Sequence, residues 1–133
     1  MKTIILNLEK TPRPHYLVSA EVSDDFLELE GKVIFPLSDP SIGDRKDHVN
    51  VAHHTFAAWN AAWVLSQQSG CKRMYALKTI IEAFKITKPD TEITIIAKVE
   101  YLNSKKTIGK FTAEFYEGKI LLAKLVSTFS AWW

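Results

Sequence analysis

Apolar and polar residues alternate over residues 26–35, as they do in a strand that buries one face. The apolar and charged residues of this stretch have opposite parity: Leu27, Leu29, Val33 and Phe35 against Glu28, Glu30 and Lys32. Residues 15–23 before it predict a second strand or a short lead-in to the first. The stretch 35–44 contains two prolines and a glycine, so we expect a loop there.

Four apolar stretches after Gly70 predict four more strands, at residues 74–87, 91–102, 109–117 and 119–133. In the second and third of these, the apolar residues share one parity: Ile93, Ile95, Ala97 and Val99, then Phe111, Ala113 and Phe115. The first stretch slips in its alternation near Ile80 and Ile81, which predicts a bulge there. The breaks between stretches are short, so the four strands are expected to form consecutive antiparallel hairpins.

Residues 51–69 contain neither proline nor glycine and predict one long helix. Gly70 stands where a C-terminal cap belongs, and either Asn50 or His48 is expected at the start. The first four turns are apolar nearly all round, which is typical of a buried helix. The aromatic stripe of Phe56, Trp59 and Trp63 is expected in the core. One long helix enclosed by a curled antiparallel sheet is an α+β fold.

Composition and charge narrow the class of protein. The 133 residues suit a single domain over residues 1–133, and 47% hydrophobic with 24% charged residues is typical of a soluble globular chain. The net charge is +2 with scattered lysines, so we expect no nucleic-acid partner. The single Cys71 excludes an intrachain disulfide. With no signal peptide and no apolar run of about 20 residues, we expect a cytoplasmic protein without a membrane partner.

The segment "DRKDHVN" at residues 44–50 joins proton-handling side chains to the start of the buried helix. The order of strand, loop, buried helix and long strands resembles the hotdog fold. The segment itself resembles the D-x-x-x-H-V-N signature of the 4-hydroxybenzoyl-CoA thioesterase branch. It is also similar to the H-x-N of the fatty-acyl-CoA thioesterase family FcoT, which has an asparagine inside the helix. Here Val51 replaces a second asparagine common in the first branch, and Asn60 lies one residue after the usual helix acid or amide position, where Trp59 stands.

The resemblance implies a thioester site shared between the protomers of a homodimer or a dimer of dimers. Asp44 would act as nucleophile or general base, or else is a turn residue, and Asp47 is expected to stabilise the helix dipole. His48 would orient the carbonyl or relay a proton, or else fix the loop. Asn50 would hold the thioester oxygen or water, or else is the N-cap. Backbone N–H groups at the helix start would polarise the carbonyl.

A second stripe on the helix joins His53, Ala57 and Asn60. The buried amide of Asn60 needs partners, which we expect to be a substrate carbonyl, a catalytic water or a backbone group of the sheet. His54 falls on another face and is expected to meet a second subunit. Adjacent histidines point about 100° apart, so we expect no metal and no other cofactor. The residues expected to contact substrate are Val51, His53, His54, Ala57 and Trp59, with the aromatic stripe as an alternative wall of an acyl pocket.

Three functions stay open at this point. The first is an acyl thioesterase acting on an acyl-CoA or an acyl-carrier-protein thioester, with Asp44, His48, Asn50 and Asn60 as its catalytic residues. The second is a hotdog β-hydroxyacyl dehydratase using His48 or His54. The helix has no Asp or Glu from Val51 to Gly70, which weakens this second possibility. The third is a non-catalytic acyl-binding module.

Overall fold

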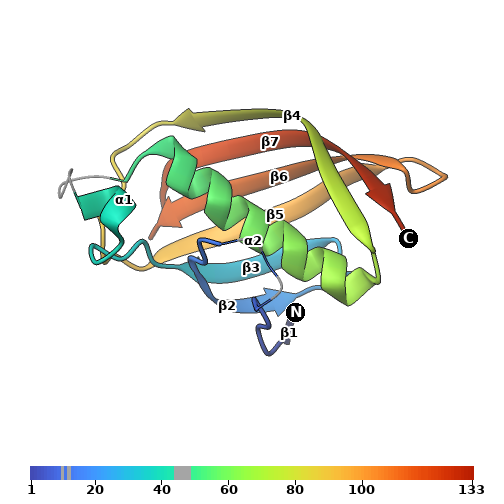
Figure 1. Cartoon of the computed structure of the whole chain (residues 1–133), viewed down its shortest axis with the longest axis horizontal. Coiled ribbons are helices and arrows are strands. Elements are labelled where there is room, and N and C mark those ends of the chain that lie inside the picture. Colours follow the sequence, from blue (N-terminus) through green and yellow to red (C-terminus); the bar gives the residue numbers. More distant parts are fainter. Residues whose placement is uncertain (10, 12, 44–48) are drawn as a thin grey trace.

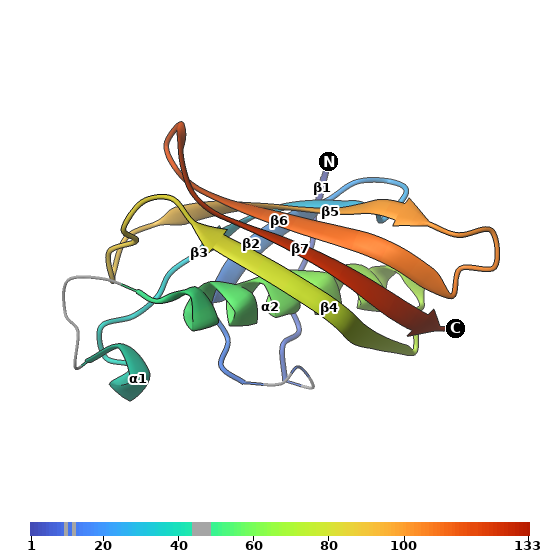
Figure 2. The same cartoon turned by 90° about the horizontal axis from the view of Figure 1, so that it is seen from above.

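The computed structural model describes residues 1–9, 11, 13–43 and 49–133. Across these residues one long helix, α2 (Val51–Ser69), lies over one face of a single antiparallel sheet (Figures 1 and 2). A short helix, α1 (Pro40–Gly43), lies within the loop expected at residues 35–44. The strands are β1 (Lys2–Thr3), β2 (Leu17–Val22), β3 (Glu28–Val33), β4 (Arg73–Ala83), β5 (Ile93–Leu102), β6 (Ile108–Glu117) and β7 (Ile120–Trp132). They are ordered β1-β2-β3-β5-β6-β7-β4.

The sheet buries the face that the alternation predicts. Leu29 and Val33 of β3 are fully buried, as are Ile93, Ile95 and Ala97 of β5; the apolar side of β6 is also buried, whereas Val99 of β5 is half-buried. Against this face α2 presents its smallest side chains, the fully or almost fully buried Ala57, Ala58, Ala61 and Ala62. Because alanine has only a methyl group, the helix axis lies close to the sheet, and the two elements share one core.

The predicted ends of the helix are confirmed. Asn50 has extended backbone angles and its side chain accepts hydrogen bonds from the N–H groups of Ala52 and His53, so Asn50 and not His48 is the N-cap. Gly70 ends the helix with φ of 81°, a left-handed conformation that glycine adopts without strain.

The predicted pairing of β4 is wrong. This strand pairs with β7 and lies at the edge of the sheet, whereas β5 pairs with β3 and β6. The hairpins β5–β6 and β6–β7 are confirmed. The bulge of β4 falls between Ala76 and Lys78, and the ladder is regular through Ile80 and Ile81. Most of β4 is exposed on both faces. The alternation of its side chains therefore does not indicate a buried face, and the sequence does not predict which strand β4 pairs with.

The aromatic stripe of α2 is not in the core, contrary to expectation. Phe56 is exposed over 42% of its surface, and Trp59 and Trp63 are half-buried. The sheet covers only the alanine face of the helix, and the bulkier aromatic residues lie beside that contact. They leave space against the sheet, which becomes a cavity described below.

The segment between β1 and β2 passes on the side of α2 that faces away from the sheet (Figure 2). Ile4, Leu6 and Leu8 of this segment pack against the core. The helix is therefore held on its outer side by the N-terminal segment as well as on its inner side by the sheet.

Candidate functional site

The start of α2 is fixed to the chain that follows β4. The backbone N–H of Val49 donates to the carbonyl oxygen of Thr87 over 2.7 Å, which forms an isolated bridge. Asn50 then caps the helix as described. The N-terminal N–H groups and the helix dipole give this end a partial positive charge, about half an elementary charge. An electron-rich oxygen is therefore stabilised here.

A hollow of about 460 Å³ lies at this end of the helix, open to solvent. We call it the helix-start hollow; its lining residues are Val49, Asn50, Val51, Ala83, Phe84, Lys85 and Ile86. Lys85 adds a cationic side chain that the sequence did not single out. The hollow brings together the helix terminus and the end of β4, which are distant in sequence.

The expected catalytic residues Asp44 and His48 lie outside the described residues, as does Asp47. Their roles stay predictions. The described residues on both sides of them are held in place, with α1 on one side and Val49 on the other.

His53 is buried and connects α2 to α1. Its Nε2 lies 3.0 Å from Ser41 Oγ, which in turn donates to Asp39 Oδ1 over 2.7 Å. The hydroxyl of Tyr16 donates to the other oxygen of Asp39 over 2.6 Å. Because Ser41 gives its proton to the carboxylate, the arrangement has His53 Nε2–H as donor to Ser41 Oγ. The chain of hydrogen bonds fastens α1 to the first turn of α2.

The protonation states of this network follow from burial and hydrogen bonding. Hydrogen bonding from Tyr16 holds the pKa of Asp39 below its usual range, whereas burial and Asp39 raise the pKa of Tyr16 to about 12. Burial lowers the pKa of His53. Its Nδ1 is buried with no hydrogen-bond partner among the described residues. A neutral histidine, a neutral phenol and a carboxylate therefore form the network at neutral pH.

His54 lies inside the core of its own chain, so the expectation that it meets a second subunit is wrong. It is 1% exposed and packs between the rings of Phe35 and Phe115, with centroids 5.2 and 5.1 Å away. Its Nδ1 lies 3.0 Å from the carbonyl oxygen of Asn50, which can only accept, so Nδ1 carries the proton. Its Nε2 then accepts from the Thr87 hydroxyl over 2.8 Å. Burial lowers the pKa of His54 to about 4.

Asn60 has backbone partners, one of the three kinds expected. Its Oδ1 accepts from the N–H groups of Tyr16 (2.8 Å) and Leu17 (3.4 Å), and its Nδ2 donates to the carbonyl oxygen of Pro14 (3.2 Å). Asn60 is 1% exposed. The amide thus fastens the chain entering β2 to the middle of α2, and a role for Asn60 in a reaction stays a prediction.

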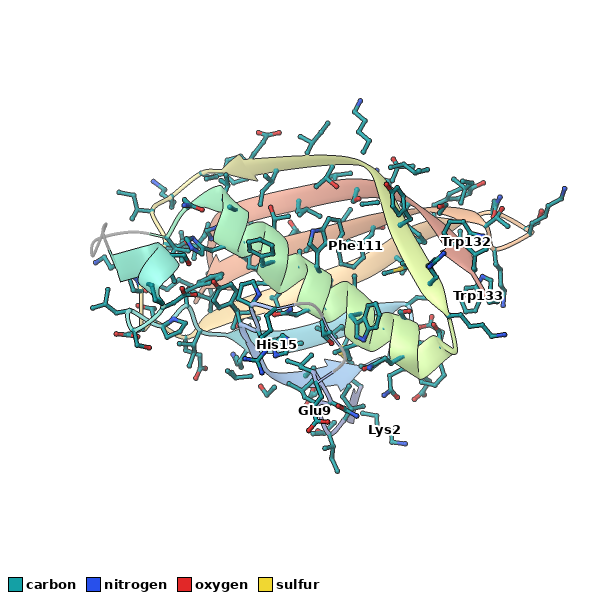
Figure 3. The ribbon with its side chains drawn as sticks, viewed as in Figure 1. Lys2, Glu9, His15, Phe111, Trp132 and Trp133 are labelled. Carbon is teal, nitrogen blue, oxygen red and sulfur yellow. The ribbon has the colours of Figure 1, made fainter. Side chains whose placement is uncertain are left out.

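The residues expected to contact substrate lie in different environments. Val51 is exposed at the helix-start hollow, Ala57 is fully buried, and Trp59 is half-buried. Trp59 stacks on Phe111 of β6, with ring centroids 6.3 Å apart and planes inclined by 27°. Figure 3 shows Phe111 beside the helix, over the sheet between α2 and β4.

Trp59 and Phe111 belong to a cavity of about 290 Å³ between α2 and the sheet, which we call the aromatic cavity. It is lined by residues from α2, β4, β6, β7 and the N-terminal segment: Arg13, Phe56, Trp59, Ala62, Trp63, Met74, Tyr75, Ala76, Phe111, Ser127 and Phe129. The aromatic stripe therefore lies on the wall of a pocket, as the alternative prediction for these three residues stated. The strand residues of the lining come from distant parts of the chain, and no local signal marks them.

Within the described ranges, no three His, Cys, Asp or Glu side chains come close enough together to hold a metal ion. Neither of the two helices found there combines the length and the apolar character needed to cross a bilayer.

Comparison with known proteins gives a likeness of fold. No family model matches the sequence, and no curated protein matches it either. A hypothetical thioesterase from Streptococcus pneumoniae, solved with coenzyme A, superposes with a TM-score of 0.70 at 12% identity over 85% of this chain and 84% of that one. The PaaI protein from the phenylacetic acid degradation operon of E. coli gives 0.68 at 13%, over 82% and 79%.

A probable thioesterase from Bartonella henselae gives a TM-score of 0.65 at 11% identity, over 80% of this chain and 90% of that one. The long helix over one antiparallel sheet and these similarities together show that the chain has the hotdog fold. The predicted α+β class is confirmed.

The depressed pKa of His54 makes stability depend on pH. The unfolded chain binds a proton at His54 below about pH 6.5, whereas the folded protein does so only below about pH 4. The free energy of unfolding should therefore fall as the pH drops through this window, by about 2 kcal/mol between pH 8 and pH 5. His53, whose pKa is also lowered, acts in the same direction. Urea unfolding at a series of pH values measures the effect, and His54→Gln should reduce it. An equal decline in the native protein and the variant would contradict the assignment to His54.

The hydrogen bonds of Asn60 predict a large cost for removing its amide. Asn60→Leu leaves two buried N–H groups and one carbonyl oxygen unpaired, so the free energy of unfolding should fall by about 3 kcal/mol. Gln67→Leu makes the same kind of change at an exposed position of the same helix and should cost less than about 0.5 kcal/mol. Denaturant unfolding compares the two variants, and equal stabilities would show that the Asn60 contacts contribute nothing.

Proposed function

We propose that this protein is an acyl thioesterase that hydrolyses an acyl-CoA or acyl-carrier-protein thioester at the start of α2. The observation that carries the proposal is the arrangement between α2 and β4. The helix-start hollow lies at one end of β4 and the aromatic cavity lies at the other. The N-terminus of α2, which can polarise a carbonyl, and an apolar cavity thus lie along the same helix. The thioesterases among proteins of this fold, one of them with bound coenzyme A, support the same function.

In this proposal the thioester carbonyl lies at the N-terminus of α2, where the helix dipole and the backbone N–H of Val51, which does not donate to the Asn50 side chain, stabilise the oxyanion of the tetrahedral intermediate. Asp44 removes a proton from water, and the resulting hydroxide attacks the carbonyl carbon; direct attack by Asp44 is the other possible route. The carbon–sulfur bond then breaks and the thiolate leaves. His48 orients the carbonyl or relays a proton.

The polar groups of α2 take supporting roles in this proposal. The side-chain oxygen of Asn50 already accepts two backbone N–H groups, so its amide NH₂ is the part that can donate to the substrate. The contacts of His53 with Ser41 and of His54 with Thr87 hold the helix start in place. The burial of His54 also argues against its use as the base of a dehydratase.

The two ends of the substrate match the two cavities. Lys85 at the helix-start hollow adds a positive charge on the side where the carrier arm leaves, which favours the phosphate-bearing arm of coenzyme A or of a carrier protein. The aromatic cavity takes the acyl group. Such a reaction would place the protein in the cytoplasm, as the sequence analysis expects.

We also propose that two copies pair through β4 into a homodimer. The strand bonds to β7 along one edge, and no described strand bonds to its other edge. Tyr75, Leu77 and Ile80 of β4 are each more than half exposed. A long apolar edge strand is a template for pairing with another strand, and a second copy of β4 would cover it.

The thioesterase proposal predicts that the protein releases free thiol from acyl-CoA substrates or from an acylated carrier protein. Asp44→Ala should lower the rate a hundredfold or more, about 2.7 kcal/mol in the barrier, because the activating carboxylate is lost. Asp24→Ala removes an exposed carboxylate in the turn before β3 and should leave the rate unchanged. Thiol release is followed spectrophotometrically. Full activity in Asp44→Ala would move the role to Asp47, and the absence of release from both carriers would overturn the proposal.

The dimer proposal predicts a measurable change in mass. Ile80→Glu places a charge on the β4 edge and should convert dimers to monomers in sedimentation equilibrium. Ile120→Glu changes an exposed isoleucine at the start of β7 and should leave the dimer intact. A native protein that sediments as a monomer at all concentrations would contradict this proposal.

A further inference from the structure

The aromatic cavity ends at a wall with more space behind it. A smaller hollow of about 40 Å³ lies next to it, towards the C-terminal end of α2, beside Leu65, Val99 and Leu102 and the partly exposed Phe26, Leu27 and Trp133; we call it the inner hollow. Four residues line both spaces: Ala62 of α2, Met74 of β4, Phe111 of β6 and Phe129 of β7. These four residues therefore form the partition between the aromatic cavity and the inner hollow.

Two side chains of the partition are held in place. Phe111 stacks on Trp59. The ring of Phe129 occupies the space left by the missing side chain of Gly109, where a Cβ would lie 2.5 Å from Phe129 Cζ. Ala62 is short and fully packed. Met74 remains as the adjustable part, since it is half-buried and its unbranched thioether side chain has three rotatable bonds.

The position of the partition along α2 gives a length. Ala62 lies eleven residues beyond Val51, about 16 Å at 1.5 Å per residue. An extended chain advances about 1.2 Å per bond, as three backbone bonds span about 3.3–3.6 Å. An acyl chain with its carbonyl at the helix start therefore reaches the partition after about fourteen carbons.

The volume of the aromatic cavity agrees with this length. Its roughly 290 Å³ is close to the lower end of the range for small-molecule sites and has room for several carbons of the chain. The remaining carbons would lie between the helix start and Phe56, the first α2 residue of the cavity. Most of the lining is apolar; its polar groups are Arg13, Tyr75, the indole N–H of Trp63 and Ser127, and Ser127 is fully buried and already bonded to Thr79 at 3.0 Å. An elongated hydrocarbon chain fits this shape better than a compact polar acyl group.

We infer that Met74 determines the longest acyl chain that the protein accepts, by closing the aromatic cavity against the inner hollow at about fourteen carbons. This inference rests on the proposed function for the position of the carbonyl. Truncating Met74 joins the two spaces, and the chain can then continue under α2. A larger side chain at the same position shortens the cavity.

The test measures thiol release from saturated acyl-CoAs of four to eighteen carbons. The native rate should fall steeply beyond the limit. Met74→Ala should raise the rate for the first excluded chain length about tenfold, since one methylene in an apolar pocket changes the rate by at least about that factor. Met74→Trp should move the limit to shorter chains. Met74→Leu keeps the volume and should keep the limit, and Ile120→Ala, an exposed position on β7, should keep it as well.

A binding measurement separates this inference from the proposed function. Free fatty acids of the same lengths are titrated into the Asp44→Ala protein and its Met74→Ala double variant, with tryptophan fluorescence from Trp59 and Trp63 as the signal. If no acyl-CoA is cleaved but the affinity shows the limit and its shift, the cavity inference stands and the hydrolase proposal fails. A native profile without a limit, or a limit unmoved by both Met74→Ala and Met74→Trp, overturns the inference.

Discussion

The contact between the alanine face of α2 and the sheet determines the rest of this structure. Four alanines let the helix approach the buried faces of β3, β5 and β6 closely. The larger aromatic side chains of the same helix cannot enter this contact and lie along its border. There they become the wall of a cavity and not part of a filled core. The fold and the pocket thus have one cause, the unequal size of side chains around a single helix.

The polar side chains of α2 hold this arrangement in register. Asn50 caps the helix, His53 reaches α1 through Ser41, His54 reaches Thr87, and Asn60 reaches the chain before β2. The last three of these residues each join the helix to a different part of the chain. In sequence these residues look like candidates for chemistry because buried polar side chains are uncommon in an apolar helix. Their hydrogen bonds show another role for such residues: they hold loops that lack regular backbone pairing in a fixed position.

The sequence predicts those features that depend on neighbours along the chain. The bounds of α2, an N-cap at either Asn50 or His48, and the inward faces of β5 and β6 follow from period, capping chemistry and alternation. The partner of β4 does not, because an edge strand exposed on both faces carries no burial pattern. The place of Phe56, Trp59 and Trp63 depends on which face of the helix the sheet covers. The lining of the aromatic cavity by Met74 and Phe129 depends on a sheet order in which β4 and β7 are neighbours.

The amide of Asn60 is the buried polar link between the N-terminal segment and the middle of α2, beside the apolar contacts of Ile4, Leu6 and Leu8. It binds the carbonyl oxygen of Pro14, and the adjacent Arg13 stands at the rim of the aromatic cavity. The N-terminal segment therefore crosses the outer side of the helix and is fastened to it by the buried hydrogen bond between Asn60 and Pro14. A ligand that displaces Arg13 at the rim therefore acts on the helix through this hydrogen bond, and a shift of the helix acts on the rim in the same way.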